Sequence, residues 1–157
     1  MALTSAQLAT LKAAILADGT LNQMYVDGNL DGLRNGVNAT ASPAFIVWKT
    51  DVSIDEIMRN GMDWARVDNL SVGKARIWDW MSRLGQFDAS RTNVRAGIDA
   101  CWVGTAADLA VRTAVYIHCK RSASFAEKVL ATGTGTDAVP ATMVFEGQVS
   151  LNDLIGL

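Results

Sequence analysis

Short segments that each combine a helix cap with an apolar face follow one another along most of the chain. In the first, Thr4 and Gln7 have capping-box spacing, and Leu8, Leu11 and Ile15 recur on one helical face. Later segments begin at a serine or threonine that can cap a helix, namely Ser53, Ser71, Ser90, Thr105 and Ser122. Glycine ends several of them. This pattern predicts a mainly α protein: a small helical bundle with a C-terminal extended arm and a short β-strand or hairpin.

The most apolar segment runs from residue 106 to residue 119. Its only polar positions before Cys119 are Asp108, Arg112, Thr113 and His118. A helix that is apolar on nearly all sides is normally buried. We therefore expect this helix to be wrapped on most sides at the centre of the bundle.

Two other stretches lack helical periodicity. Residues 27–43 are dominated by Asn, Asp, Gly, Ala and Ser, which predicts a loop with at most one short helical turn. Residues 44–48 fit either a buried strand or one helical turn. We place the bundle at residues 1–131, with 27–43 as its loop, and the arm at residues 132–157.

The arm opens with alternating threonine and glycine and then carries the short apolar run 143–145. An isolated hairpin is marginally stable in water, so this run must add to a sheet in the same chain or in a neighbour. We expect residues 133–149 to lie on a neighbouring subunit. Ser150 and Asp153 predict a final helical turn.

The charge balance and the cysteine content exclude several classes of protein. Fourteen Lys plus Arg against sixteen Asp plus Glu give a net charge of −2, so no global attraction draws the chain to nucleic acid or to anionic lipid. Two cysteines are too few for a disulfide scaffold, and no apolar run is long enough for a signal peptide or a membrane span. We expect folding in a cytoplasm and no membrane partner.

The residues that could perform chemistry are sparse. His118 is the single histidine, and it projects about 100° around the helix from the adjacent Cys119, which suits neither a shared metal ion nor a nucleophilic pair. The Gly/Thr run near residue 134 lacks the lysine and the following helix of a phosphate loop. We predict that the protein is not an enzyme and has no catalytic residues, cofactor or metal.

Two groups of residues are candidates for contacts with partners. Trp78 and Trp80 project about 200° apart from one helix, so they serve two different contacts, one of them a subunit interface. We add the apolar residues of the arm, which gives a candidate interface of Trp78, Trp80, Val144, Phe145 and Val149. Lys120, Arg121 and Lys128 form a basic cluster, for which a solvated helix end is favoured over a nucleic-acid site.

Several phrases of the chain resemble a family of small tailed-bacteriophage proteins, encoded between capsid and tail genes and interpreted as head-tail connectors or adaptors. The resemblance covers most of the chain from about residue 41 onward and is loose before it. It is carried by the phrases at residues 45–50, 67–78, 95–98, 131–135 and 140–147.

The resemblance implies a helical protomer that repeats as a ring at the neck of the virion, beneath the portal and around the DNA channel. It further implies a dodecamer whose partners are its own copies, the portal protein, the next neck or tail protein, and DNA that passes without sequence specificity. The family brings no catalytic residues. The alternatives are a tail terminator or capsid decoration protein, and a small helical DNA-binding regulator.

Overall fold

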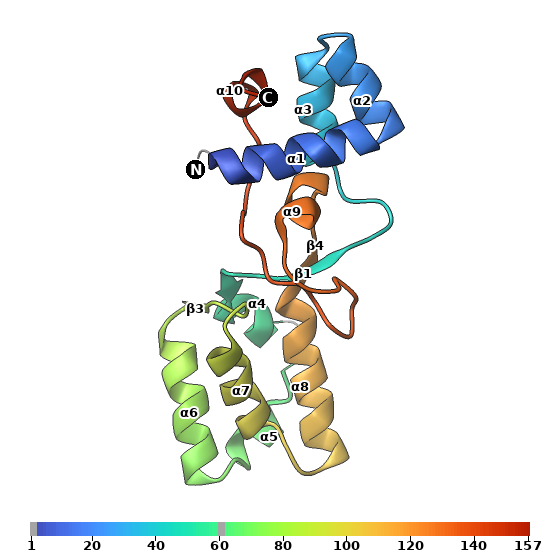
Figure 1. Ribbon diagram of the computed structural model, residues 1–157. Coiled ribbons are helices and arrows are strands. Elements are labelled where there is room, and N and C mark those ends of the chain that lie inside the picture. The colour runs from blue at the N-terminus through green and yellow to red at the C-terminus, as the bar shows by residue number, and fades with distance from the viewer. Residues whose placement is uncertain (1–2, 60–61) are drawn as a thin grey trace. The chain divides into compact units, whose positions relative to one another are not determined.

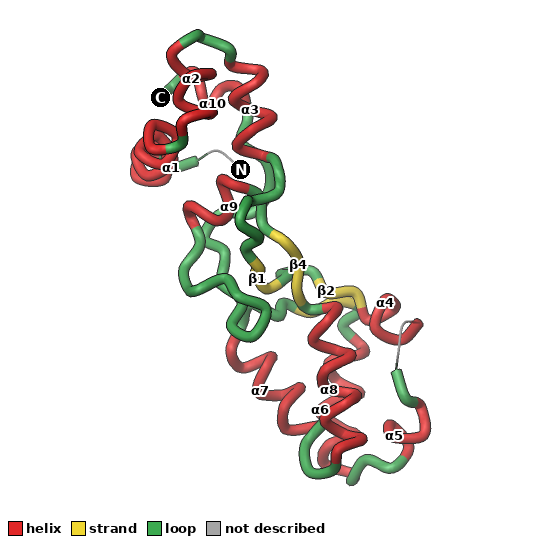
Figure 2. Tube along the Cα trace, turned by 90° about the vertical axis from the view of Figure 1, so that its right-hand side faces the viewer, coloured by secondary structure: helices red, strands yellow, loops and turns green. Residues whose placement is uncertain are grey.

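A computed structural model describes residues 3–59 and 62–157. In these ranges the chain is mainly helical, as predicted, with ten helices and two small two-stranded antiparallel sheets (Figures 1 and 2). The chain divides into two compact units. Unit 1 joins the residues up to Val47 to Ser122–Leu157, and unit 2 is Trp48–Arg121. This division differs from the boundary that we expected after residue 131, because the C-terminal arm packs with the N-terminal helices.

Unit 1 holds the helices from the two ends of the chain. They are α1 (Ser5–Ala17), α2 (Gly19–Val26), α3 (Leu30–Asn38), α9 (Phe125–Leu130) and α10 (Leu151–Ile155). The predicted capping box of Thr4 and Gln7 opens α1, and the one formed by Ser150 and Asp153 opens α10. The cap of α9 is Ser124 rather than Ser122, which lies in a strand.

Helix α3 corrects the loop that we predicted for residues 27–43. The side chain of Asn29 caps this helix by accepting a hydrogen bond from the backbone N–H of Gly32. Leu33 and Val37, one turn apart, are fully buried. The Asn- and Gly-rich composition favoured a loop, but a side-chain cap and a narrow apolar face that packs on other helices are enough to form a helix here.

The C-terminal arm lies against its own unit, so our prediction that it reaches a neighbouring subunit is wrong for this structure. Phe145, Val149 and Leu154 are buried in one cluster with side chains of α1 and α3. The Asn38 side chain accepts a hydrogen bond from the Val149 N–H at 2.8 Å and donates one to the Val149 carbonyl at 3.0 Å.

The arm also pairs with β1 (Ile46–Trp48) of the same chain, although it forms no regular strand in residues 132–157. The N–H of Ala141 donates to the Ile46 carbonyl at 2.9 Å, and the N–H of Ile46 donates to the Gly135 carbonyl at 2.7 Å. A single bridge joins Thr132 to Thr142. The backbone groups of the arm are thus partly satisfied within the chain.

Unit 2 contains the helices α4 (Ile54–Arg59), α5 (Trp64–Asp68), α6 (Val72–Arg83), α7 (Thr92–Cys101) and α8 (Ala106–His118). β2 (Val52–Ser53) pairs antiparallel with β3 (Gln86–Phe87), and β1 pairs with β4 (Lys120–Ser122). The ambiguous segment 44–48 is therefore largely a strand. The cap of α8 at Thr105 is a complete capping box with Asp108.

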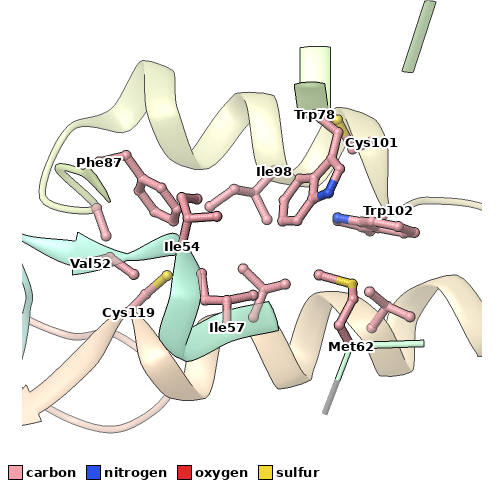
Figure 3. Packing of buried hydrophobic residues seen from close by; sticks show 13 residues of the cluster. Val52, Ile54, Ile57, Met62, Trp78, Phe87, Ile98, Cys101, Trp102 and Cys119 are labelled. Atoms are coloured by element: carbon pink, nitrogen blue, oxygen red, sulfur yellow. The ribbon is translucent and has the colours of Figure 1, made fainter. Parts of the chain in front are cut away.

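The core of unit 2 is built from the inward faces of α4, α6, α7 and α8 (Figure 3). Trp102 is fully buried. The indole rings of Trp78 and Trp102 pack edge to face, with their centroids 5.3 Å apart. At the rim of the core, Arg66 forms an ion pair with the buried Asp108, and its hydrogen bond lowers the pKa of the Asp108 carboxyl to about 2.

Candidate subunit-contact surface

The two tryptophans of α6 have opposite environments: Trp78 is buried in the core, and Trp80 is exposed to solvent. Trp78 is 3% exposed and packs in the core of unit 2, so it has no surface to offer to another subunit. Trp80 is 66% exposed. Trp78 is therefore removed from the predicted interface, and a subunit contact of Trp80 stays a prediction.

The candidate residues of the arm also separate. Phe145 and Val149 are buried within unit 1, so the prediction that they form a subunit interface is wrong for these two residues. Val144 is 63% exposed and stays a candidate. Burial by their own chain follows from the position of the arm against α3, which the sequence pattern did not reveal.

The three basic candidates belong to different units. Lys120 and Arg121 are half-buried residues of β4 in unit 2. Lys128 lies in the last turn of α9 in unit 1, where a cation is favoured by the helix dipole. The sequence cluster is thus split between the two units.

An exposed apolar stripe runs along α6 and its C-cap. Ile77, Trp80 and Leu84 follow the spacing i, i+3, i+7, which places them within about 60° of one another around the helix. They are 36%, 66% and 70% exposed. α6 turns only Trp78 fully and Met81 partly toward the core of unit 2. We call Ile77, Trp80 and Leu84 the α6 stripe.

A free cation borders the stripe. Arg76 is exposed one turn before Trp80 and has no hydrogen bond or ion pair with the residues that the structure describes. Tryptophan and arginine are the residue types most enriched where protein interfaces are strongest. The sequence held a signal for this surface, because α6 has more apolar positions than one buried face needs.

The exposed area of Trp80 is large enough to matter for binding. A tryptophan side chain buries roughly 200 Å², so about 130 Å² of Trp80 is available to a partner. At about 25 cal/mol per Å², covering it would contribute about 3 kcal/mol before the costs of association. A contiguous apolar surface of this kind is typical of an interaction site.

His118 belongs to a small ionic cluster in unit 2. Its Nδ1 lies 3.3 Å from Oε1 of Glu56, and Nζ of Lys49 lies 3.3 Å from Oε2 of the same carboxylate. The hydrogen bonds from His118 and Lys49 lower the pKa of Glu56. Burial raises the pKa of the Cys119 thiol to about 12, so this group is an unreactive thiol at neutral pH.

A cavity of about 580 Å³ lies in unit 1 between α3 and residues 148–151. Its charged side chain, Arg34, is paired with Asp31 at 3.3 Å. Among residues 3–59 and 62–157, no group of three or more His, Cys, Asp or Glu side chains could hold a metal ion. None of the described helices is long and apolar enough to span a bilayer.

Comparison with known proteins gives no relative. No protein-family model matches the chain, and no curated protein and no solved structure is significantly similar to it.

Proposed function

We propose that the chain is a structural subunit of a tailed-bacteriophage virion, a head-tail connector or adaptor that forms a ring at the neck beneath the portal. The observation that carries this proposal is the exposed α6 stripe, which gives the chain a surface suited to another protein. The phrases that resemble connector proteins support the same function, and two of them fall on β1 and on α5–α6.

The chemistry of the surface suits a subunit that acts by shape. A tryptophan flanked by aliphatic side chains and a free arginine favours contact with protein, and the only histidine is tied to a carboxylate in its own unit. The net charge of −2 agrees with a channel component past which DNA moves without being held. The partners in this proposal are copies of the chain, the portal, and the next neck or tail protein.

The test is the oligomeric state of the purified full-length chain over a wide range of concentration, by mass photometry and negative-stain electron microscopy. We expect closed rings of one diameter, with twelve subunits. A chain that stays monomeric, yet binds DNA with an affinity that falls steeply with salt, would contradict the proposal and favour the DNA-binding regulator. Electron microscopy of the virion then separates a neck ring from a tail terminator or a capsid decoration protein.

A further inference from the structure

Helix α8 carries a second exposed surface that no function described so far uses. Leu109 is 40% exposed and Ile117 is 65% exposed. Three further exposed residues, Ala106, Ala110 and Thr113, lie with them in an arc of about 100°. We call these five residues the α8 face. It is uncharged along its whole length, whereas the exposed side of a solvated helix normally carries charged residues.

We propose that the α6 stripe of one copy packs on the α8 face of a second copy, so that each subunit uses two different surfaces in a head-to-tail contact. The proposal rests on the ring function above and specifies which surfaces close the ring. Both helices belong to unit 2, and Figure 1 shows α7 between them. Every copy can therefore receive one neighbour on α8 and offer α6 to another.

The α6 stripe and the α8 face are similar in length, and large side chains on one can pack against small side chains on the other. α6 has 12 residues and α8 has 13, which correspond to about 18 Å and about 20 Å. The α6 stripe projects a tryptophan and two large aliphatic side chains. The α8 face presents one alanine and one threonine, Ala110 and Thr113, between Leu109 and Ile117, and small residues allow a close approach of a large side chain.

The occupant that covers both surfaces with one contact is a second copy of the chain. A symmetric contact of α6 with α6 would bury the stripe but would leave Leu109 and Ile117 of both copies in water. A head-to-tail contact covers the α6 stripe and the α8 face of every subunit once the ring closes. Such a contact generates a ring, or an open filament where the rotation does not close.

The contact between one α6 stripe and one α8 face is small. It involves one helix face about 18 Å long and about 10 Å wide on each subunit, which is a small patch beside the ~800 Å² of accessible surface that each partner contributes to a standard interface. A free dimer is therefore not expected to be stable. A closed ring gives each subunit two such contacts, so assembly should be cooperative and should depend strongly on concentration.

Cross-linking between introduced cysteines tests the head-to-tail arrangement directly. Ile77→Cys and Thr113→Cys are each near the middle of their helix, so the two thiols approach one another in a parallel or an antiparallel packing. The native Cys101 and Cys119 are fully buried. With a short bifunctional thiol reagent, the full-length double variant should give a ladder of multimers, and a mixture of the two single variants should give dimers only.

Each single variant alone is the control, and it should give no cross-linked product. A dimer from Ile77→Cys alone would show α6 against α6 and would overturn the proposal. A second measurement uses Trp80→Glu, for which self-association should weaken at least tenfold. Val72→Glu is the matched control, because Val72 is 77% exposed in the first turn of α6, about two turns from Trp80 and outside the α6 stripe, so that its replacement should leave assembly unchanged.

The outcomes separate this proposal from the proposed function. If the wild type forms rings while the mixture does not cross-link and Trp80→Glu assembles normally, the α6–α8 contact is refuted and the connector function stands. If the wild type remains monomeric at every concentration and no pair cross-links, both are refuted. Should Trp80→Glu fail to fold, as judged by circular dichroism, the cross-linking experiment still decides.

Discussion

The position of the C-terminal arm can be tested by truncating two adjacent residues that the structure places in opposite environments. Phe145 is 6% exposed and packs in the core of unit 1, whereas Val144 is 63% exposed. Phe145→Ala removes a buried ring and leaves a cavity, and Val144→Ala removes two methyl groups that face solvent. The pair differs in burial but hardly in position along the chain.

Truncation of a buried phenylalanine to alanine costs about 3–5 kcal/mol, from lost transfer free energy and from the cavity. With a urea dependence of about 2 kcal/mol per M, a loss of about 4 kcal/mol lowers the unfolding midpoint by about 2 M. A surface substitution such as Val144→Ala changes stability by about 0.5 kcal/mol or less, which is a shift of about 0.25 M or less.

The assay is urea unfolding of the monomer, followed by circular dichroism and by tryptophan fluorescence. All five tryptophans lie in unit 2, so fluorescence reports unit 2, while circular dichroism reports both units. Phe145→Ala should lower the circular dichroism midpoint at every protein concentration. If its monomer unfolds like the wild type, and only its assembly is weakened, then the arm belongs on a neighbouring subunit and our description of unit 1 is wrong.

Three further predictions concern stability and reactivity. The pKa of Asp108 is lowered to about 2 from a usual value of about 3.9, so the ionised carboxylate stabilises the folded state fully above the usual value, and this stabilisation is lost as pH falls through about 2. The difference in urea midpoint between wild type and Asp108→Asn should therefore shrink between pH 4 and pH 2. Burial raises the pKa of Cys101 to about 11 and that of Cys119 to about 12, so a thiol reagent should modify both residues only after unfolding, and rapid modification of the native protein would contradict this burial. Gly135→Ala should lower the thermal midpoint more than Gly28→Ala, because both positions have a positive φ but only the new Cβ at 135 would overlap a side chain, the ring of Phe45; equal shifts would argue against that contact.

The sequence predicts local structure well where caps and apolar spacing agree. The predicted N-cap at Thr105 and the apolar run after it coincide with α8, and Ser71 marks the start of α6 to the residue. α2 was missed because a single residue, Asp18, both ends α1 and caps α2, and α3 was missed because its cap, Asn29, lies in a stretch whose composition favours turns. Short-range composition does not report that a narrow apolar face will be covered by distant helices.

Long-range pairing lies beyond these local rules. The arm was expected on a neighbouring subunit because its composition breaks with that of the bundle and because an isolated hairpin is marginally stable in water. Its partner is α3, more than 100 residues away, and the deciding contact is the amide side chain of Asn38 against the backbone of Val149. An asparagine in a polar segment carries no signal that distinguishes such a clamp from a solvated surface residue.

In unit 2, α6 and α8 form where the sequence predicts them, but the burial of their apolar residues differs from the prediction. The apolar composition of α8 predicts burial on most sides, yet Leu109 and Ile117 remain exposed, and α6 likewise has Trp80 and Leu84 in water. Each helix has formed where the sequence placed it, so a wrong assignment does not explain the exposure. α6 and α8 each carry an apolar face that their own chain leaves exposed, and the proposed contact between copies would bury both faces.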